Sequence, residues 1–211
     1  MRMRRKKNLD TRLERCGDLW VREPEAMRGR WLEGRTEPEL HLEIGCGKGR
    51  FTRETAAAEP GALLIAIERE QNVFCLAMEG AQAMGLTNLR FIDGDAAKLN
   101  ELFAPGEVAR IYLNFSDPWH SRRHEKRRLT AAGFLEIYKQ ILAPGGEIHF
   151  KTDNRPLFDF SIAQFPACDY VLEQVTTDLH GAGITGVMTD YEEKFHEMGT
   201  PICRCVARWE G

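Results

Sequence analysis

The stretch Leu40-His41-Leu42-Glu43-Ile44-Gly45-Cys46-Gly47-Lys48-Gly49 decides the fold of this chain. A short, mostly apolar run ends in a turn with three glycines, and residues 51–58 then have a helical composition. Glycine lets the backbone approach a ligand closely, where a Cβ atom would clash. The glycines do not follow the G-x-G-x-x-G spacing of dinucleotide sites. The stretch therefore predicts a strand, a ligand-binding turn and a helix, for a ligand that is not a dinucleotide.

Apolar runs of strand length alternate with helical segments along the rest of the chain. The expected strands cover 40–44, 62–67, 89–92, 108–115, 147–151, 170–175 and 202–209, and the expected helices cover 51–58, 71–84, 96–103 and 156–165, with another after a cap at Thr130. This alternation is typical of an α/β fold, a mostly parallel seven-stranded sheet with helices on both faces. Residues 8–38 are polar and irregular, so we expect a basic N-terminal extension over 1–38 and one domain over 39–211.

The composition argues against several classes of protein. The 211 residues are 43% hydrophobic and 29% charged, as is usual for a globular domain. No run approaches the ~20 apolar residues that span a bilayer, and the basic N-terminus lacks the apolar segment of a secretory signal. The six cysteines form no C-x-x-C pair, and the histidines lack metal-ligand spacing. We therefore expect reduced thiols, no metal, no membrane contact and a cytoplasmic location, in a monomer or a homodimer.

The net charge of -3 conceals an uneven distribution. Residues 1–7 carry +5 and residues 122–128 carry +4, which leaves -12 on the other 197 residues. Two concentrated basic segments in an acidic chain indicate localised contact with a polyanion. This distribution predicts binding to RNA or DNA.

A carboxylate lies at the end of each of the first four predicted strands: Glu43, Glu68, Asp95 and Asp117. Ligands of open α/β sheets bind beyond the carboxyl ends of the strands. Glu43 would attract a cation and repel a pyrophosphate, Glu68 can accept hydrogen bonds from a ribose diol, and Asp95 can accept one from an adenine amino group. The set fits S-adenosylmethionine, which combines a sulfonium, a ribose and an adenine without phosphate.

The fourth strand runs into Asn114-Phe115-Ser116-Asp117-Pro118-Trp119, and the basic run 122–128 follows closely. Aromatic side chains stack on unpaired or flipped bases, so a flat ring can be placed near Pro118 and Trp119. Asp117 would then lie beside the methyl donor.

These motifs resemble those of the bacterial tRNA (guanine-N7)-methyltransferases, which belong to the class I S-adenosylmethionine-dependent methyltransferases with a Rossmann-like fold. The similar segments are 114–119, His124-Glu125-Lys126-Arg127-Arg128-Leu129, Lys151-Thr152-Asp153-Asn154 and Thr189-Asp190-Tyr191-Glu192-Glu193-Lys194-Phe195. The glycine turn and the basic N-terminus are similar too. The resemblance runs in the same order over nearly the whole chain.

The resemblance implies transfer of a methyl group from S-adenosylmethionine to N7 of a guanine in tRNA, at position 46 in the variable loop. It implies catalytic roles for Asp117 and Asp153. The implied cofactor-binding residues are Glu43, Gly45, Gly47, Gly49, Glu68, Asp95 and Asp117. The implied substrate-binding residues are Ser121, Asp153, Thr189, Asp190, Tyr191 and Glu192. The implied RNA-binding segment is Arg123, His124, Glu125, Lys126, Arg127 and Arg128.

The chain departs from the family pattern after Trp119. His120-Ser121 stands where the family usually has Pro-Lys, so Ser121 replaces a substrate-contacting lysine, and Arg122 or Arg123 is a candidate for the lost cation. Two other functions stay open at this point. One is methylation of another nucleic-acid nitrogen, although the D-P-P-[YWF] motif of amino-methylating enzymes is incomplete here. The other is RNA binding without catalysis, which a degraded cofactor turn would favour.

Overall fold

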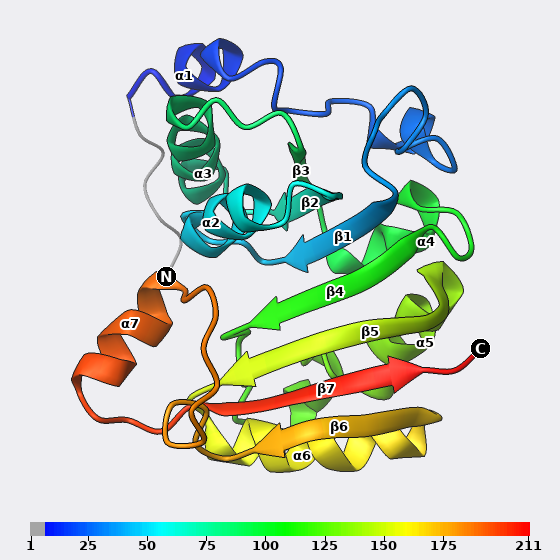
Figure 1. Ribbon diagram of the computed structural model, residues 1–211, viewed down its shortest axis with the longest axis vertical. Helices are drawn as coiled ribbons and strands as arrows, with labels where there is room; N and C mark the ends of the chain where they lie inside the picture. The colour runs from blue at the N-terminus through cyan, green and yellow to red at the C-terminus, as the bar shows by residue number, and fades with distance from the viewer. Residues whose placement is uncertain (1–6) are drawn as a thin grey trace.

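The computed structural model describes residues 7–211, and its central feature is one seven-stranded sheet (Figure 1). The strand order is β3-β2-β1-β4-β5-β7-β6. The strands are β1 (Glu39–Ile44), β2 (Ala62–Glu68), β3 (Leu89–Asp93), β4 (Val108–Asn114), β5 (Leu142–Thr152), β6 (Tyr170–Thr176) and β7 (Cys203–Trp209). Only β7 runs antiparallel to its neighbours among these strands. The predicted fold class, a mostly parallel sheet with helices on both faces, is confirmed.

Helices cover both faces of the sheet, and each face has its own core (Figure 1). The α-helices are α1 (Leu9–Arg15), α2 (Arg50–Ala58), α3 (Gln71–Ala83), α4 (Leu99–Leu102), α5 (Ala132–Ile141), α6 (Arg155–Ala167) and α7 (Asp190–Glu197), and the 3₁₀ turns are η1 (Pro24–Met27), η2 (Ala96–Lys98) and η3 (Arg122–Arg127). Side chains alternate along a strand, so Leu42 of β1 packs toward α4 and α5, while Leu64 of β2 packs toward α1 and α3. Because β1, β2, β3, β4 and β5 run parallel, their carboxyl ends meet at one edge of the sheet.

The N-terminal segment differs from the irregular structure that we expected over residues 8–38. Leu9 and Leu13 are four residues apart on α1, and both are buried against α3. Residues 19–21 run beside β3, with Val21 N donating to Phe91 O at 2.9 Å. Residues 1–6 of the expected extension lie outside the described part of the chain. The boundary at residue 38 therefore stays a prediction.

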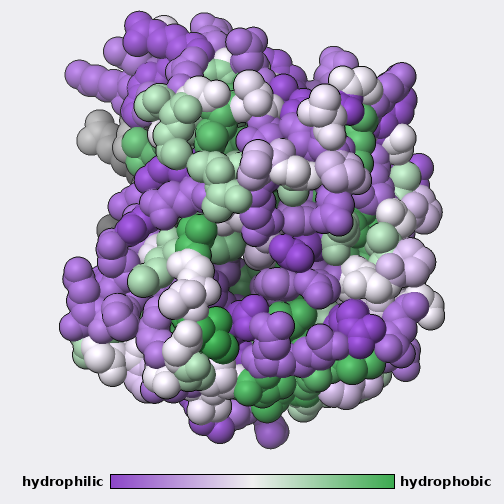
Figure 2. Space-filling model, in the orientation of Figure 1, coloured by the Kyte–Doolittle hydropathy of each residue, from purple (hydrophilic) through white to green (hydrophobic). Residues whose placement is uncertain are grey.

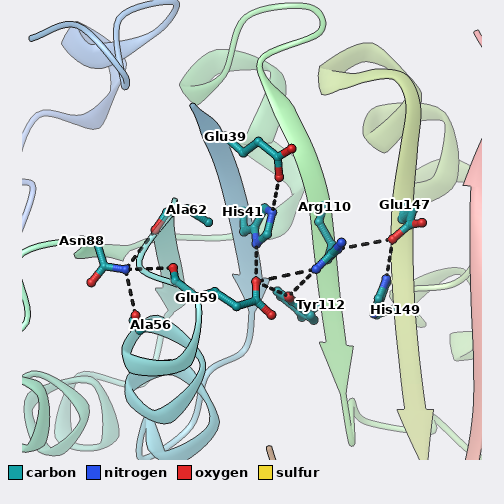
Figure 3. A network of polar contacts seen from close by, with 10 residues as sticks. All are labelled: Glu39, His41, Ala56, Glu59, Ala62, Asn88, Arg110, Tyr112, Glu147 and His149. Atoms are coloured by element: carbon teal, nitrogen blue, oxygen red, sulfur yellow. Dashed lines mark hydrogen bonds and ion pairs between the residues drawn. The ribbon is translucent and has the colours of Figure 1, made fainter. Parts of the chain in front are cut away.

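A polar network lies on one face of β1, β4 and β5, next to the C-terminal end of α2 (Figure 3). His41 contacts Glu59 at 3.2 Å, Arg110 bridges Glu59 at 3.6 Å and Glu147 at 3.3 Å, and Glu147 contacts His149 at 2.7 Å (Figure 3). Burial lowers the pKa of His41, and it lowers the pKa of His149 to about 4. Both rings are therefore neutral at neutral pH, and the network ties the end of α2 to the sheet on a largely hydrophilic face (Figure 2).

Trp31 tests whether the N-terminal segment is part of the folded unit. Its side chain is 2% exposed, stacks on Phe103 and donates from Nε1 to Leu102 O at 3.0 Å. Because a large core side chain would be lost, Trp31→Ala should lower the free energy of unfolding by about 3–5 kcal/mol. Trp20→Ala, at a half-buried tryptophan of the same segment, should cost less. Urea denaturation of both variants measures the two free energies of unfolding. Equal decreases would contradict the assignment of Trp31 to the core between the sheet and α4 and α5.

Candidate active site

The turn after β4 is held in a strained backbone conformation. Phe115 and Trp119 have φ angles of 52° and 43°, which bulky side chains rarely adopt. Such residues cost of order 1–3 kcal/mol each and persist where their surroundings fix them. Phe115 N donates to Lys151 O at 2.9 Å, and Arg128 donates to the carbonyls of Pro118 and Trp119 at 2.9 and 3.3 Å. These bonds fix the course of the segment that carries Asp117.

A pocket of about 710 Å³ lies at the carboxyl ends of β1, β2, β3 and β4, and we call it the strand-end pocket. Its wall includes four of the predicted cofactor residues: Gly45, Glu68, Asp95 and Asp117. The wall continues through Asn114, Phe115, Ser116, Trp119, Lys126 and Arg127. The structure therefore brings together strand-end residues that are up to 72 positions apart, from Gly45 to Asp117. Its volume is in the range of small-molecule sites.

The glycine turn fits tightly between the sheet and α3. A Cβ atom at Gly49 would lie 2.7 Å from the Cβ atom of Ala77, so a larger residue there would push α2 and α3 apart. Gly45 has a φ of 79° and open space where a Cβ would lie, on the wall of the pocket. Gly47 contributes a backbone hydrogen bond, in which its N–H donates to Glu68 Oε2 at 3.1 Å.

Glu68 is already fixed by three backbone N–H groups. Oε2 accepts from Gly47, and Oε1 accepts from Arg69 and Glu70 at 2.9 Å each. A carboxylate offers about four acceptor positions, so about one is left for a ligand hydroxyl. Asp95 is more open, since its carboxylate accepts from Ala97 N at 3.0 Å and lies 3.5 Å from Arg69. Both residues line the strand-end pocket, and their contacts with a cofactor stay a prediction.

Glu43 occupies a different position from the one that we expected. It is 2% exposed, and among residues 7–211 the wall of the strand-end pocket does not include it. Thr52 donates to one of its oxygens, and Asn114 Nδ2 donates to the other at 3.1 Å. Burial raises the pKa of Glu43 to about 7, against the hydrogen bonds from Thr52 and Asn114 and the charge of Lys151.

The proposed substrate segment at residues 189–192 forms the start of α7. The Thr189 hydroxyl caps the helix by accepting from Glu192 N at 2.9 Å. Tyr191 is 64% exposed and stacks on Phe115, with 6.4 Å between the ring centroids. Arg50, the first residue of α2, forms an ion pair with Glu193. Helix α7 is therefore held next to both the β4 turn and the residue that follows the glycine turn.

Glu192 points inward rather than toward solvent. It is 2% exposed, and its carboxylate lies 2.6 Å from Lys151 Nζ and 3.5 Å from His180. Lys151 also donates to Val187 O at 3.2 Å. Sequence reasoning assigned no role to Lys151 or Arg50, although Lys151 opens the motif that contains Asp153. Asp153 itself is half-buried just after β5, at the same edge of the sheet as Asp117.

The basic segment divides into exposed and buried members. Ser121, Arg123, His124, Lys126 and Arg127 are exposed, and Glu125 is half-buried. Lys126 and Arg127 also line the strand-end pocket, and Arg127 lies over the Trp119 ring at 4.9 Å. Arg128 is 8% exposed and bound to backbone carbonyls, so its guanidinium supports the turn instead of facing outward.

The residues of the strand-end pocket suit S-adenosylmethionine. Carboxylates come from three strand ends, those of β2, β3 and β4. Two polar atoms at the end of β4, Asn114 Oδ1 and Ser116 Oγ, have no hydrogen-bond partner in the described chain. Within residues 7–211, no group of three or more histidine, cysteine or acidic side chains is arranged to hold a metal ion. No helix in the same range is long and apolar enough to cross a membrane.

The buried carboxyl of Glu43 should make stability depend on pH. Its pKa is about 7 in the folded protein, above the ordinary 4.5. Between these two pH values the folded protein therefore keeps a proton that the unfolded chain has lost. Stability is then full below about pH 4.5 and falls as the pH rises through about 7, by on the order of 3 kcal/mol. Glu43→Gln should lack this fall. Urea denaturation from about pH 5 to 8 measures the free energy of unfolding, with the exposed Glu101→Gln as control. If this free energy falls with pH equally in Glu43→Gln and in wild type, the assignment to Glu43 is contradicted.

Comparison with known proteins agrees with this geometry. A family described as "Putative methyltransferase" matches residues 37–205. The chain is 44% identical over 213 residues to a tRNA (guanine-N(7)-)-methyltransferase of Streptococcus suis, covering 100% of both chains. It is 45% identical to the enzyme of that name from Geobacillus kaustophilus, covering 98% of this chain and 96% of the relative. The enzyme of that name from Bacillus subtilis is 42% identical, with 99% of each chain covered.

Solved structures show the same fold at low sequence identity. A 16S rRNA (adenine(1408)-N(1))-methyltransferase from Catenulisporales acidiphilia, solved with its cosubstrate SAM, has a TM-score of 0.60 at 13% identity, covering 100% of this chain and 95% of that chain. The 16S rRNA methyltransferase KamB also has a TM-score of 0.60 at 13% identity, with 83% and 90% covered. The fold is thus a Rossmann-like methyltransferase fold, and the full-length identity decides the family. The chain belongs to the tRNA (guanine-N(7)-)-methyltransferase family.

Proposed function

We propose that this protein transfers the methyl group of S-adenosylmethionine to N7 of a guanine in tRNA. The observation that carries the proposal is the strand-end pocket, where two carboxylates for the cofactor, Glu68 and Asp95, lie beside Asp117, helix α7 and two exposed cations. The curated relatives of about the same length are named for this reaction. Position 46 of the tRNA and a cytoplasmic location stay predictions.

The reaction places few demands on the protein. Guanine N7 carries an in-plane lone pair, so no general base is needed to create the nucleophile. S-adenosylmethionine, when bound, supplies an electrophilic methyl group on a sulfonium. Asp117 lies exposed on the wall of the pocket, where it can contact both cofactor and base. Alignment of N7 with the methyl group is therefore the main contribution of the site.

Asp117 and Asp153 account for the charge and for the choice of base. Methylation at N7 makes the guanine ring cationic, and a nearby carboxylate stabilises that charge as it develops. A carboxylate also accepts from guanine N1–H and from the exocyclic amine, which adenine cannot match. Asp153 follows β5 and Asp117 follows the neighbouring β4, so the two flank one edge of the sheet. We assign guanine recognition to Asp153 and place Asp117 between the cofactor and the base.

The tRNA is held by the exposed part of the basic segment. Arg123, Lys126 and Arg127 would contact phosphates without reading sequence. Ser121 stands at the start of the same segment, so the neighbouring Arg122 and Arg123 are our candidates for the cation that the family usually supplies as lysine. We assign α7 to base binding because Tyr191 is exposed and stacks on Phe115 of the pocket wall, while Thr189 caps the helix and Asp190 is also exposed.

The function is tested by methylation of unmodified tRNA with labelled S-adenosylmethionine, followed by chemical cleavage at N7-methylguanosine. We expect label in the tRNA and cleavage at a guanine. Asp153→Asn should lower turnover by roughly 10-fold to 100-fold, because one lost hydrogen bond to a charged group is worth about 1.5–3 kcal/mol. Label on another atom would replace the proposed reaction with methylation of that nitrogen. Near-normal turnover by Asp153→Asn would remove Asp153 from the base-reading role.

The basic segment predicts a salt-dependent affinity for tRNA. Each phosphate contact on single-stranded RNA adds about -0.7 to the slope of log K against log salt. Lys126→Ala should therefore make the slope shallower by about 0.7. Arg208→Ala is the matched control, because Arg208 pairs with Glu173 and lies in register with Glu147, away from the strand ends. Filter binding over a salt series measures both slopes; a slope unchanged by Lys126→Ala, or changed equally by the control, would contradict this role.

A further inference from the structure

Helix α7, which carries the proposed substrate segment, is not held in place by a hydrophobic core. All eight of its residues lie in the described part of the chain, and the one that is buried is a carboxylate, Glu192. Helices shorter than about 12–15 residues are marginal by themselves in water. Phe115 stacks on Tyr191 and Phe195, but Tyr191 is 64% exposed. The position of α7 therefore depends strongly on its polar contacts.

Two cations from different elements supply these contacts. Lys151 of β5 binds Glu192 on the buried side of the helix at 2.6 Å. Arg50, the first residue of α2, binds Glu193, whose side chain is 49% exposed. Helix α7 is thus tied to the strand that ends just before Asp153 and also to the helix that follows the glycine turn.

The contact between Arg50 and Glu193 has the geometry of a strong ion pair. Nη1 and Nη2 of Arg50 donate to the two carboxylate oxygens of Glu193, with 3.0 Å between Nη2 and Oε1. Nε donates to Glu54 Oε1 at 3.0 Å, one turn further along α2, and Asp190 lies 4.0 Å from Nη1. Isolated surface ion pairs contribute little, but a bidentate pair within a network of charges is the exception. The network therefore directs the guanidinium of Arg50 at α7.

The backbone of Arg50 is fixed where the glycine turn becomes α2. Gly49 packs so closely on α3 that a Cβ atom there would lie 2.7 Å from the Cβ atom of Ala77. Its carbonyl accepts from Arg53 N at 3.0 Å, in the first turn of the helix. Gly45, at the other end of the same turn, lines the strand-end pocket. Arg50 thus connects α7 to the turn that forms part of the cofactor pocket.

We propose that Arg50 is a positioning residue that acts through Glu193 and holds α7 in the position that binds tRNA. The inference rests on the proposed function, because it takes α7 as a tRNA-binding element. Arg50 contacts the helix and not the base, so it affects the affinity for tRNA and not the methyl transfer. Without the ion pair, tRNA binding must itself order α7, and the affinity falls by the free energy that this ordering requires.

The sign of the charge effect separates this role from a direct phosphate contact. If Arg50 bound phosphate itself, removal of the Glu193 carboxylate would free the guanidinium and strengthen tRNA binding. If Arg50 acts through Glu193, the same removal weakens binding, although the protein loses a negative charge. Glu197→Ala is the matched control, because it removes the same charge from the other end of the same helix.

The experiment measures the dissociation constant of unmodified tRNA by filter binding, together with KM and kcat for methyl transfer. Arg50→Ala and Glu193→Ala should each raise the dissociation constant and KM by roughly 5-fold, at the upper end for an exposed ion pair. The double variant should bind no more weakly than either single variant, since both remove one contact. At saturating tRNA, kcat should stay at the wild-type level, because bound tRNA restores the position of α7. Glu197→Ala should leave the affinity unchanged or raise it.

Isothermal titration calorimetry with S-adenosylhomocysteine shows whether each variant keeps its cofactor pocket, and the dissociation constant should equal that of wild type. Unchanged or stronger tRNA binding in Glu193→Ala overturns the proposal. An equal loss in Glu197→Ala, losses that add in the double variant, or a lower kcat at unchanged KM overturn it too. If Arg50→Ala fails to bind S-adenosylhomocysteine, Glu193→Ala decides by the same criteria. Absence of methyl transfer to tRNA by wild type would instead refute the proposed function itself.

Discussion

The site depends on the way in which Lys151 joins three elements at the end of β5. Its carbonyl accepts from Phe115 N, which extends the pairing of β4 and β5 into a residue with positive φ. Its ammonium group binds Glu192 at 2.6 Å and holds the start of α7. Phe115 in turn stacks on Tyr191 and Phe195 of that helix. The turn that carries Asp117 and the helix that carries the substrate segment are therefore both anchored to Lys151, in addition to the contacts of Arg128 with the turn and of Arg50 with the helix.

Two buried carboxylates near this point are stabilised in different ways. Glu192 has a cation in contact, so Coulomb attraction offsets much of its desolvation. Glu43 receives hydrogen bonds from two neutral groups, and its pKa rises to about 7 because these bonds do not compensate fully for burial. Neither arrangement is an efficient source of stability, since apolar residues of similar size often serve as well. Both carboxylates instead fix the direction of a neighbouring side chain, Lys151 in one case and Asn114 in the other.

The strands and the strand-end carboxylates could be predicted from the sequence because buried parallel strands are nearly continuous apolar runs. Contacts between distant segments could not be predicted in the same way. Thr130 was expected to cap a helix, but α5 begins at Ala132 and the Thr130 hydroxyl bonds Ser161 at 2.7 Å, which is a tertiary contact. Helix α1 was missed because its two leucines matter only against α3. For Glu43, residue spacing gave the correct strand end, whereas the direction of the side chain depends on Thr52 and Asn114.

The basic segment also shows that tertiary contacts, and not residue type alone, set the direction of a side chain. Residues 122–127 form a 3₁₀ turn, in which side chains three positions apart lie on one side. Glu125 and Arg128 are three apart, lie 3.6 Å from each other, and Arg128 turns inward to the carbonyls of Pro118 and Trp119. The residues between them, Lys126 and Arg127, line the strand-end pocket. A count of charges treats all these cations alike, whereas in the structure Arg128 holds the backbone of the turn and Lys126 and Arg127 are exposed at the pocket, where we propose that they contact phosphate.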